Sequence, residues 1–126
     1  MRKRSGVKMA VDVQRVVSFF LHGEAARTVD WKPATDIYRT SNGWLVKMEL
    51  AGVKREDVNI SLRGRTLLVR GRRRDCALEE GAQQLHMEIA YDLFERSVEL
   101  PAELHRVTIE TSLQDGMLLI RITPEG

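Results

Sequence analysis

From residue 31 to the end of the chain, hydrophobic and polar residues alternate in short segments that Gly, Asn, Asp and Pro separate. Alternation with a period of two is typical of β-strands that bury one face. The predicted strands are 35–39, 44–50, 58–62, 66–70, 85–90, 94–100, 107–113 and 117–123. Turn sequences at 41–43, 63–65 and 114–116 join neighbouring strands. Because each strand has one face to bury, we expect two stacked antiparallel sheets, an all-β sandwich.

The first 30 residues follow a different pattern, and we interpret them as an N-terminal arm before a sandwich domain at 31–126. Within the arm, apolar residues at helical spacing predict a short amphipathic helix over 9–21. Its apolar face would consist of Val13, Val16, Val17 and Phe20. This face could pack on its own domain or on a neighbouring subunit, or it could bind other proteins. A membrane-surface role is a further alternative, because basic residues flank the helix.

The same N-terminal stretch could be mistaken for a targeting signal. Asp12, Gln14 and Arg15 interrupt its apolar run, which a secretory signal would not tolerate. No stretch of about 18 apolar residues occurs anywhere in the chain. We therefore expect neither export nor integral membrane association.

Residues 71–84 are too polar for a core strand and too many for a hairpin turn, so they predict a long exposed loop. Alternation then resumes at 85–90, with Leu85, Met87 and Ile89 on one side. A short strand on a long loop is not stable by itself in water. It needs a partner edge, and another subunit can provide one.

Composition and charge limit the kinds of partner and the redox environment that we expect for this protein. The chain has 126 residues and a formal net charge of +2, so the balance of charge favours neither nucleic acid nor an anionic membrane as partner. Its single cysteine, Cys76, cannot form an internal disulfide, which fits a reducing cytoplasm. The basic run of Arg70, Arg72, Arg73 and Arg74 could contact phosphates, but acidic residues follow it and no aromatic residues are interleaved. We favour a solvated loop, with no nucleic acid as partner.

No motif for chemistry stands out. His22, His86 and His105 are far apart and have no cysteine at ligand spacing, so no metal site is expected. The chain has no nucleotide-binding glycine pattern and no nucleophile motif. We expect a protein that is not an enzyme and needs no cofactor.

Five segments occur in an order and spacing that resemble the α-crystallin domain of the small heat-shock proteins, closest to the bacterial branch. They are WKPATDIY, LVKMELAGVKREDVNISL, LLVRGRRR, MEIAYDLFERSVELP and TIETSLQDGMLLIRI. The resemblance covers about residues 31 to 123 and implies an immunoglobulin-like β-sandwich. It also implies an ATP-independent holdase, which binds partly unfolded client proteins and prevents their aggregation. Two local departures are Ala51-Gly52-Val53 in place of a proline-glycine turn, and Asp92 in place of a glycine.

The resemblance also implies roles for particular residues. Arg96 matches an arginine at the dimer interface. The strand at 85–90, with Leu85, Met87 and Ile89, matches a segment that pairs with the 35–39 edge of a second subunit, which includes Ile37. Strands bordering a hydrophobic client groove match two sets of residues here. These are Val58, Ile60 and Leu62, and Val107, Ile109 and Leu113.

The end of the chain departs from the family pattern. Family members continue into a tail with an I-x-I motif, whereas this chain stops after Thr123-Pro124-Glu125-Gly126. Ile120-Arg121-Ile122 has that spelling but lies inside the final predicted strand, so we interpret it as core. Without a tail, a homodimer or modest homo-oligomer is expected. The alternative is a CS-domain-like adaptor or co-chaperone, which would be monomeric and lack the exchanged loop; the long loop favours the holdase.

Overall fold

The computed structural model describes residues 6–12, 17–18, 29–75 and 78–125. In these ranges the chain forms nine strands and one short 3₁₀ helix. Their bounds are β1 (Gly6–Asp12), β2 (Val17–Ser18), β3 (Thr35–Thr40), β4 (Gly43–Glu49), η1 (Arg55–Asp57), β5 (Val58–Arg63), β6 (Thr66–Arg73), β7 (Asp92–Glu99), β8 (Arg106–Gln114) and β9 (Met117–Pro124).

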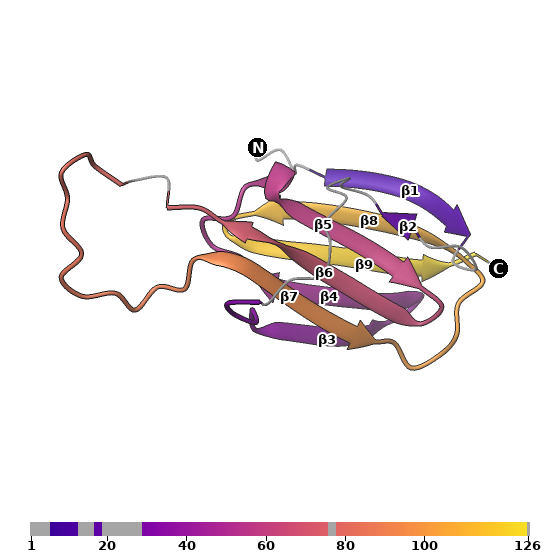
Figure 1. The fold of residues 1–126 in the computed structure, drawn as a ribbon. Coiled ribbons are helices and arrows are strands. Elements are labelled where there is room, and N and C mark those ends of the chain that lie inside the picture. Colours follow the sequence, from indigo (N-terminus) through magenta and orange to yellow (C-terminus); the bar gives the residue numbers. More distant parts are fainter. Residues whose placement is uncertain (1–5, 13–16, 19–28, 76–77, 126) are drawn as a thin grey trace.

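The strands form two antiparallel sheets that stack face to face (Figure 1). One sheet has five strands in the order β1-β8-β9-β4-β3, and the other has four in the order β2-β5-β6-β7. This arrangement confirms the all-β sandwich that the alternating pattern predicts. The N-terminal strands lie on one lateral side of the sandwich, and β3 and β7 lie on the other.

The core consists of the alternate residues that each strand turns toward the opposite sheet. On β4, for example, Trp44, Val46 and Met48 are buried while the residues between them are less so. The same alternation buries Ile120 and Ile122 of β9, which confirms that Ile120-Arg121-Ile122 belongs to the core. Burying each such large apolar side chain stabilises the fold by about 1.5–3 kcal/mol, so the interior of the sandwich is its main source of stability.

Two predicted turns have the backbone geometry that their residues favour. Asp115 and Gly116 connect β8 to β9 and have φ values of 54° and 77°. Positive φ at both central residues is characteristic of a type I′ hairpin turn, in which Asp-Gly is a preferred pair. Gly64 has a φ of 61° between β5 and β6. Local sequence therefore fixes both hairpins.

The N-terminal helix prediction is wrong over the described part of 9–21. Gly6–Asp12 is strand β1, which pairs with β8 from Gly6↔Ser112 to Asp12↔Arg106. Val17–Ser18 is strand β2, which pairs with Leu62 and Ser61 of β5. Hydrophobic residues at 7, 9 and 11 also fit the period of two that is typical of a strand. Hydrogen bonding to the edge of β8 favours the strand over the helix. The rest of the predicted helix lies outside the described residues.

One prediction around the long loop also needs correction, and a second, which involves another subunit, stays a prediction. Strand β6 continues to Arg73, three residues beyond the predicted end, because β7 begins at Asp92 and pairs with it. The predicted strand at 85–90 is irregular backbone in the single chain. Among the described residues, no strand edge lies beside that segment to supply hydrogen bonds.

Candidate dimer interface and client groove

The sandwich has one lateral side where two strand edges are open. Strand β3 pairs with β4 alone, and β7 pairs with β6 alone, among the strands that the structure describes. An open edge presents unpaired backbone N–H and C=O groups and is a template for another strand. We refer to this β3/β7 side as the open side.

The beginning of the β7 edge is covered by a short segment of the same chain. The backbone N–H groups of Asp30 and Trp31 donate to the Leu93 carbonyl at 2.8 and 3.2 Å, and the Glu95 N–H donates to the Trp31 carbonyl at 3.4 Å. The Trp31 ring packs on Phe94 with ring centroids 5.2 Å apart. Within the part of the chain that the structure describes, the second half of β7, from Arg96 onward, is therefore left as an open edge.

Arg96 begins this uncovered half. It lies two residues from both Phe94 and Val98, which are buried, so its side chain starts on the same inner face of the sheet. Its Nε atom is buried and has no hydrogen-bond acceptor among the described residues. A buried guanidinium N–H without an acceptor costs about 1–3 kcal/mol or more, so this position favours a partner that supplies one.

Strand β3 presents apolar side chains at its open edge. Ile37 lies opposite the buried Val46 and is still 46% exposed, because no strand lies beyond β3 in the described part of the chain. Tyr38 points to the other face, where the Lys47 ammonium lies 4.9 Å from its ring centroid. The inner side of the β3 edge is therefore hydrophobic. On its outer side, the Lys47 ammonium lies over the Tyr38 ring.

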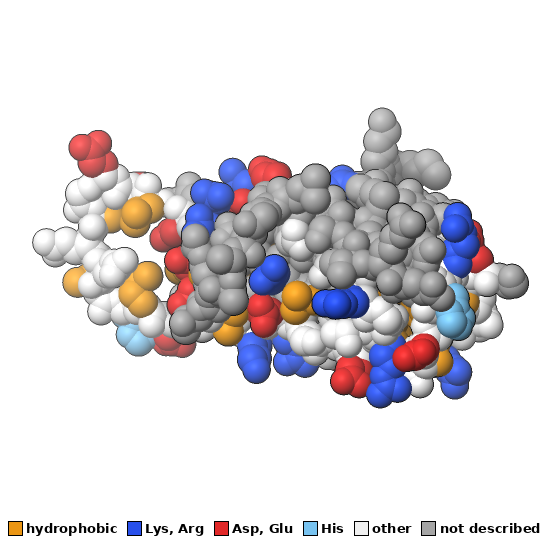
Figure 2. Space-filling view, turned by 45° about the vertical axis from the view of Figure 1, so that its right-hand side comes forward, with side chains coloured by type: hydrophobic (Ala, Val, Ile, Leu, Met, Phe, Trp, Pro, Cys, Tyr) orange, Lys and Arg blue, Asp and Glu red, His pale blue; other side chains and the backbone are white. Residues whose placement is uncertain are grey.

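The long connection between β6 and β7 leaves the body of the sandwich (Figure 1). We call the described residues of this connection, 74–75 and 78–91, the loop arm. Leu85, Met87 and Ile89 alternate along it and are 91%, 51% and 62% exposed. Figure 2 shows hydrophobic side chains of this projection standing apart from the body of the molecule. The apolar positions that sequence alternation identified are therefore exposed, although the described residues form no strand there.

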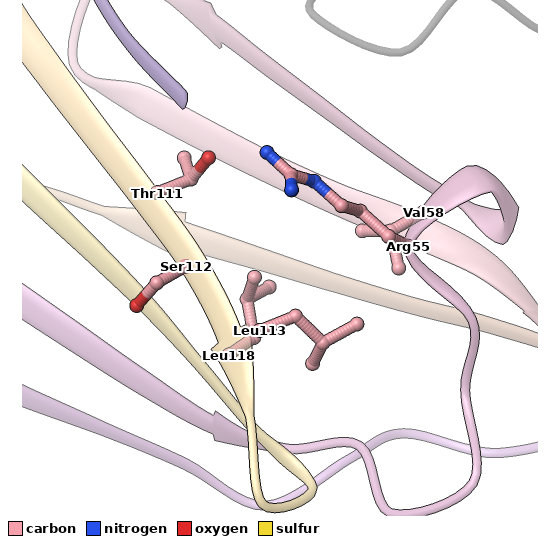
Figure 3. Close-up of a pocket in the computed structure, with 6 residues that line it drawn as sticks. All are labelled: Arg55, Val58, Thr111, Ser112, Leu113 and Leu118. Carbon is pink, nitrogen blue, oxygen red and sulfur yellow. The ribbon is translucent and has the colours of Figure 1, made fainter. Parts of the chain in front are cut away.

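Most of the residues expected to border a client groove are buried in the core, because alternate residues of β5 and β8 face inward. They are Val58, Ile60, Leu62, Val107 and Ile109. Val58 and Leu113 are the two expected residues that line a shallow pocket between the start of β5 and the end of β8 (Figure 3). The complete lining is Arg55, Val58, Thr111, Ser112, Leu113 and Leu118.

The predicted client-binding face of the N-terminal arm can be placed only in part. Val17 lies in β2, where its backbone is in register with Leu62. Val13, Val16 and Phe20 lie outside the described residues, so this face stays a prediction.

The basic run that could have bound phosphate makes contacts within the fold instead. Arg72 and Arg73 lie in β6, and Arg74 follows directly. Arg72 pairs with Asp92, and Arg74 pairs with the buried Asp57. These ion pairs within the fold were not predicted from the sequence. The position of the basic run directly before a long loop was the signal that could have indicated them.

These features define a β-sandwich whose open edges and projecting loop are its candidate binding surfaces. The Hsp20/alpha crystallin family model matches residues 36–125. The chain therefore belongs to the Hsp20/α-crystallin family, the small heat-shock proteins.

Several proteins of this family are similar to the chain. Small heat shock protein C2 of Rickettsia felis is 33% identical over 91 residues, which are 71% of this chain and 58% of that protein. Heat shock protein HSP.16.4 of Streptococcus thermophilus is 30% identical over 94 residues, which are 73% of this chain and 66% of that protein. Across the first curated relatives, the chain spans from a quarter to about three fifths of their length.

Solved structures share the fold. Heat shock protein 16.0 from Schizosaccharomyces pombe superposes with a TM-score of 0.66 at 23% identity, covering 75% of this chain and 87% of that one. The hspA protein from Xanthomonas axonopodis gives 0.64 at 24% identity, covering 75% and 95%. Within the described residues, the structure contains no helix long and apolar enough to cross a membrane.

Proposed function

We propose that this chain is an ATP-independent holdase that binds partly unfolded proteins and acts as a homodimer or modest homo-oligomer. Membership of the small heat-shock protein family supports a chaperone function. The observation that carries the proposal is the loop arm, whose described residues from 78 to 89 are all exposed while its apolar residues alternate as in a strand. Exposure of this kind is costly in a monomer and favours binding.

In the proposed dimer, residues 85–90 of one subunit add to the open β3 edge of the other. Strand addition would give the arm the hydrogen bonds that the described part of its own chain does not provide, and it would cover Leu85, Met87 and Ile89. Ile37 would be buried in the same step, since it lies on the inner side of the β3 edge. Arg96 would then find its acceptor on the partner subunit. A cytoplasmic location and the absence of enzymatic activity stay predictions.

Client binding is proposed at two places. The first is the small pocket lined by Val58 and Leu113, between the start of β5 and the end of β8. The apolar residues of the N-terminal arm at 13, 16, 17 and 20 are the second place. Neither requires bound nucleotide.

The test combines mass with activity. Light scattering on a sizing column would give the mass of the full chain, and suppression of heat aggregation of an unrelated enzyme would be measured without ATP. We expect a dimer or larger species that suppresses aggregation. A strict monomer without suppression would contradict the holdase and leave the adaptor as the better candidate.

Arm variants make the test specific to the proposed interface. The triple variant Leu85→Ser, Met87→Ser, Ile89→Ser keeps the arm's length and removes its apolar positions. Its matched control is Gln84→Ser, His86→Ser, Glu88→Ser, which changes the alternate positions. We expect the dimer dissociation constant to rise about a hundredfold in the first variant and severalfold at most in the control. Equal dimerisation of both variants would exclude exchange of the arm.

A further inference from the structure

The loop arm has a narrow root. Arg73 at the end of β6 and Asp92 at the start of β7 are register partners in the antiparallel ladder, so the whole arm leaves and returns at one point. Loops with closely spaced ends still sample many directions unless contacts at the root restrict them. The three consecutive arginines Arg72, Arg73 and Arg74 supply such contacts here.

The outer two arginines tie each end of the arm to the sandwich. Arg72 Nε donates to Asp92 Oδ1 at 2.8 Å, which joins the last residues of β6 to the residue where the chain returns. Arg74 Nε and Nη2 donate to the two carboxylate oxygens of Asp57, each at 3.0 Å. Asp57 is buried in η1, so the first residue of the arm is bound to a rigid part of the fold.

Arg73 makes the most extensive set of contacts. Its Nε and Nη2 atoms both donate to the Ala90 carbonyl, at 2.8 and 2.6 Å, and its Nη1 atom donates to the Ala51 carbonyl at 3.1 Å. The guanidinium also lies over the Trp31 ring, 4.0 Å from its centroid, with the Tyr91 ring at 5.9 Å. One side chain thus connects β6, the turn after β4, the segment before β3 and the last residues of the arm.

We propose that Arg73 is a positioning residue that fixes the direction in which the loop arm leaves the sandwich. It presents Leu85, Met87 and Ile89 to the β3 edge of a second copy of this chain, and in this respect the inference rests on the proposed dimer. Holding the last residues of the arm at Ala90 removes conformational freedom before association. Affinity then rises because less entropy is lost on binding.

The contacts require an arginine. Three nitrogens in one plane reach two carbonyl groups while the flat face stacks on Trp31. A lysine has the same charge, but its single ammonium cannot bind both carbonyls and stack in the same way. Charge alone therefore does not reproduce the role.

The experiment compares Arg73→Ala and Arg73→Lys in the full chain with a matched control, Arg65→Ala. Arg65 pairs with Glu99 at 3.0 Å at the opposite end of the same sheet, so the control also loses an arginine and its side-chain contact, but away from the root of the arm. Sedimentation equilibrium would give the dimer dissociation constant, and urea unfolding below that constant would give the stability of the monomer. Backbone NMR order parameters at 85–90 in the monomer would report how firmly the arm is held.

We expect Arg73→Ala to raise the dimer dissociation constant about tenfold or more, Arg73→Lys severalfold, and Arg65→Ala less than about twofold. The backbone order parameters at 85–90 should fall in both Arg73 variants and stay unchanged in the control. A residue that only stabilised the fold would lower the urea midpoint and leave the dissociation constant of the folded fraction unchanged.

The possible failures are distinguishable. If both Arg73 variants dimerise as tightly as Arg65→Ala while the triple serine variant of the arm does not dimerise, the positioning role is wrong and the proposed dimer stands. If the triple serine variant dimerises like the parent chain, the proposed interface itself is wrong, and the inference is wrong with it. Should Arg73→Ala fail to fold, Arg73→Lys decides: an unchanged dissociation constant overturns the role.

Discussion

The two lateral sides of the sandwich differ in how far their strand edges are covered. On one side, β1 covers the edge of β8 over seven register positions and β2 covers part of the β5 edge. We call this the closed side. On the open side, β3 has no further strand beside it in the described chain, and Asp30 and Trp31 cover only the beginning of β7. The same chain thus protects two edges with its own N-terminal strands and leaves two available.

The difference between the two sides indicates that association with another chain is favoured on the open side. An open edge can pair with a strand of another chain. Proteins usually cover an edge that must stay unpaired, or place charged residues along it. The closed side follows this rule. The open side combines an uncovered edge, the exposed Ile37, and the buried Nε of Arg96 without an acceptor among the described residues. Each of these features costs free energy in a monomer, and one partner could relieve all three.

Replacing Arg96 should change the open side most. In Arg96→Met the dimer dissociation constant should rise about a hundredfold, because loss of one member of a buried pair costs about 3 kcal/mol or more. The monomer should become more stable by about 1 kcal/mol, because a buried donor without an acceptor is removed. Sedimentation equilibrium measures the first effect, and urea unfolding below the dissociation constant measures the second.

The opposite signs make the Arg96 result specific. Arg70→Met is a suitable control, because Arg70 lies on the neighbouring strand β6 and is half-exposed beside Glu95, 3.9 Å away. We expect it to change either quantity by less than about 0.5 kcal/mol. A monomer destabilised by Arg96→Met, with dimerisation unchanged, would mean that Arg96 acts within its own subunit.

Removing β1 should make the closed side resemble the open one. A chain without residues 1–12 exposes the edge of β8, and we expect species larger than the parent oligomer, with association strengthened about tenfold. The effect should be smaller than that of Arg96, because Arg106 and Glu110 already place charges along β8. Light scattering at several concentrations would measure it.

A lysine provides the control for the exposed β8 edge. In the shortened chain, Thr108→Lys adds a charge in the middle of β8, opposite the position that Ala10 occupied, and should restore the parent mass. If the shortened chain has the parent mass without this change, β1 does not protect the edge, and the closed side owes its isolation to the charges on β8.

The sandwich was predictable because the sequence patterns of its strands and turns are local. Val46 and Met48 alternate with polar residues, and Asp115-Gly116 specifies its turn, so local sequence and global fold agree. The N-terminal segment was not predictable, since its apolar residues fit both a helix and a strand. The edge of β8 decides between them, and that edge exists only after the sandwich has formed.

The candidate site was predictable to a lesser degree. Alternation identified Leu85, Met87 and Ile89 as apolar positions of the loop arm. It could not separate Val58, which also lines the pocket, from Ile60, which does not, because both are buried on one face of β5. The contacts of Arg73 join segments far apart in the sequence, including Ala51 and Ala90, and only tertiary structure brings these together.

Asp92, where the arm rejoins β7, offers the smallest and sharpest test of the open side. Its φ of 69° is left-handed, and its carboxylate binds Arg72. In a monomeric Arg96→Met background, Asp92→Ala should lose about 1 kcal/mol, because alanine tolerates this φ less well than aspartate and breaks the exposed ion pair. Asp92→Gly breaks the same pair but adopts positive φ without strain, so its stability should stay within about 0.5 kcal/mol of the background. Urea midpoints of the two variants would separate backbone strain from the ion pair. Equal losses in both would assign the effect to the Arg72 contact, and an unchanged alanine variant would show that neither matters at the root of the arm.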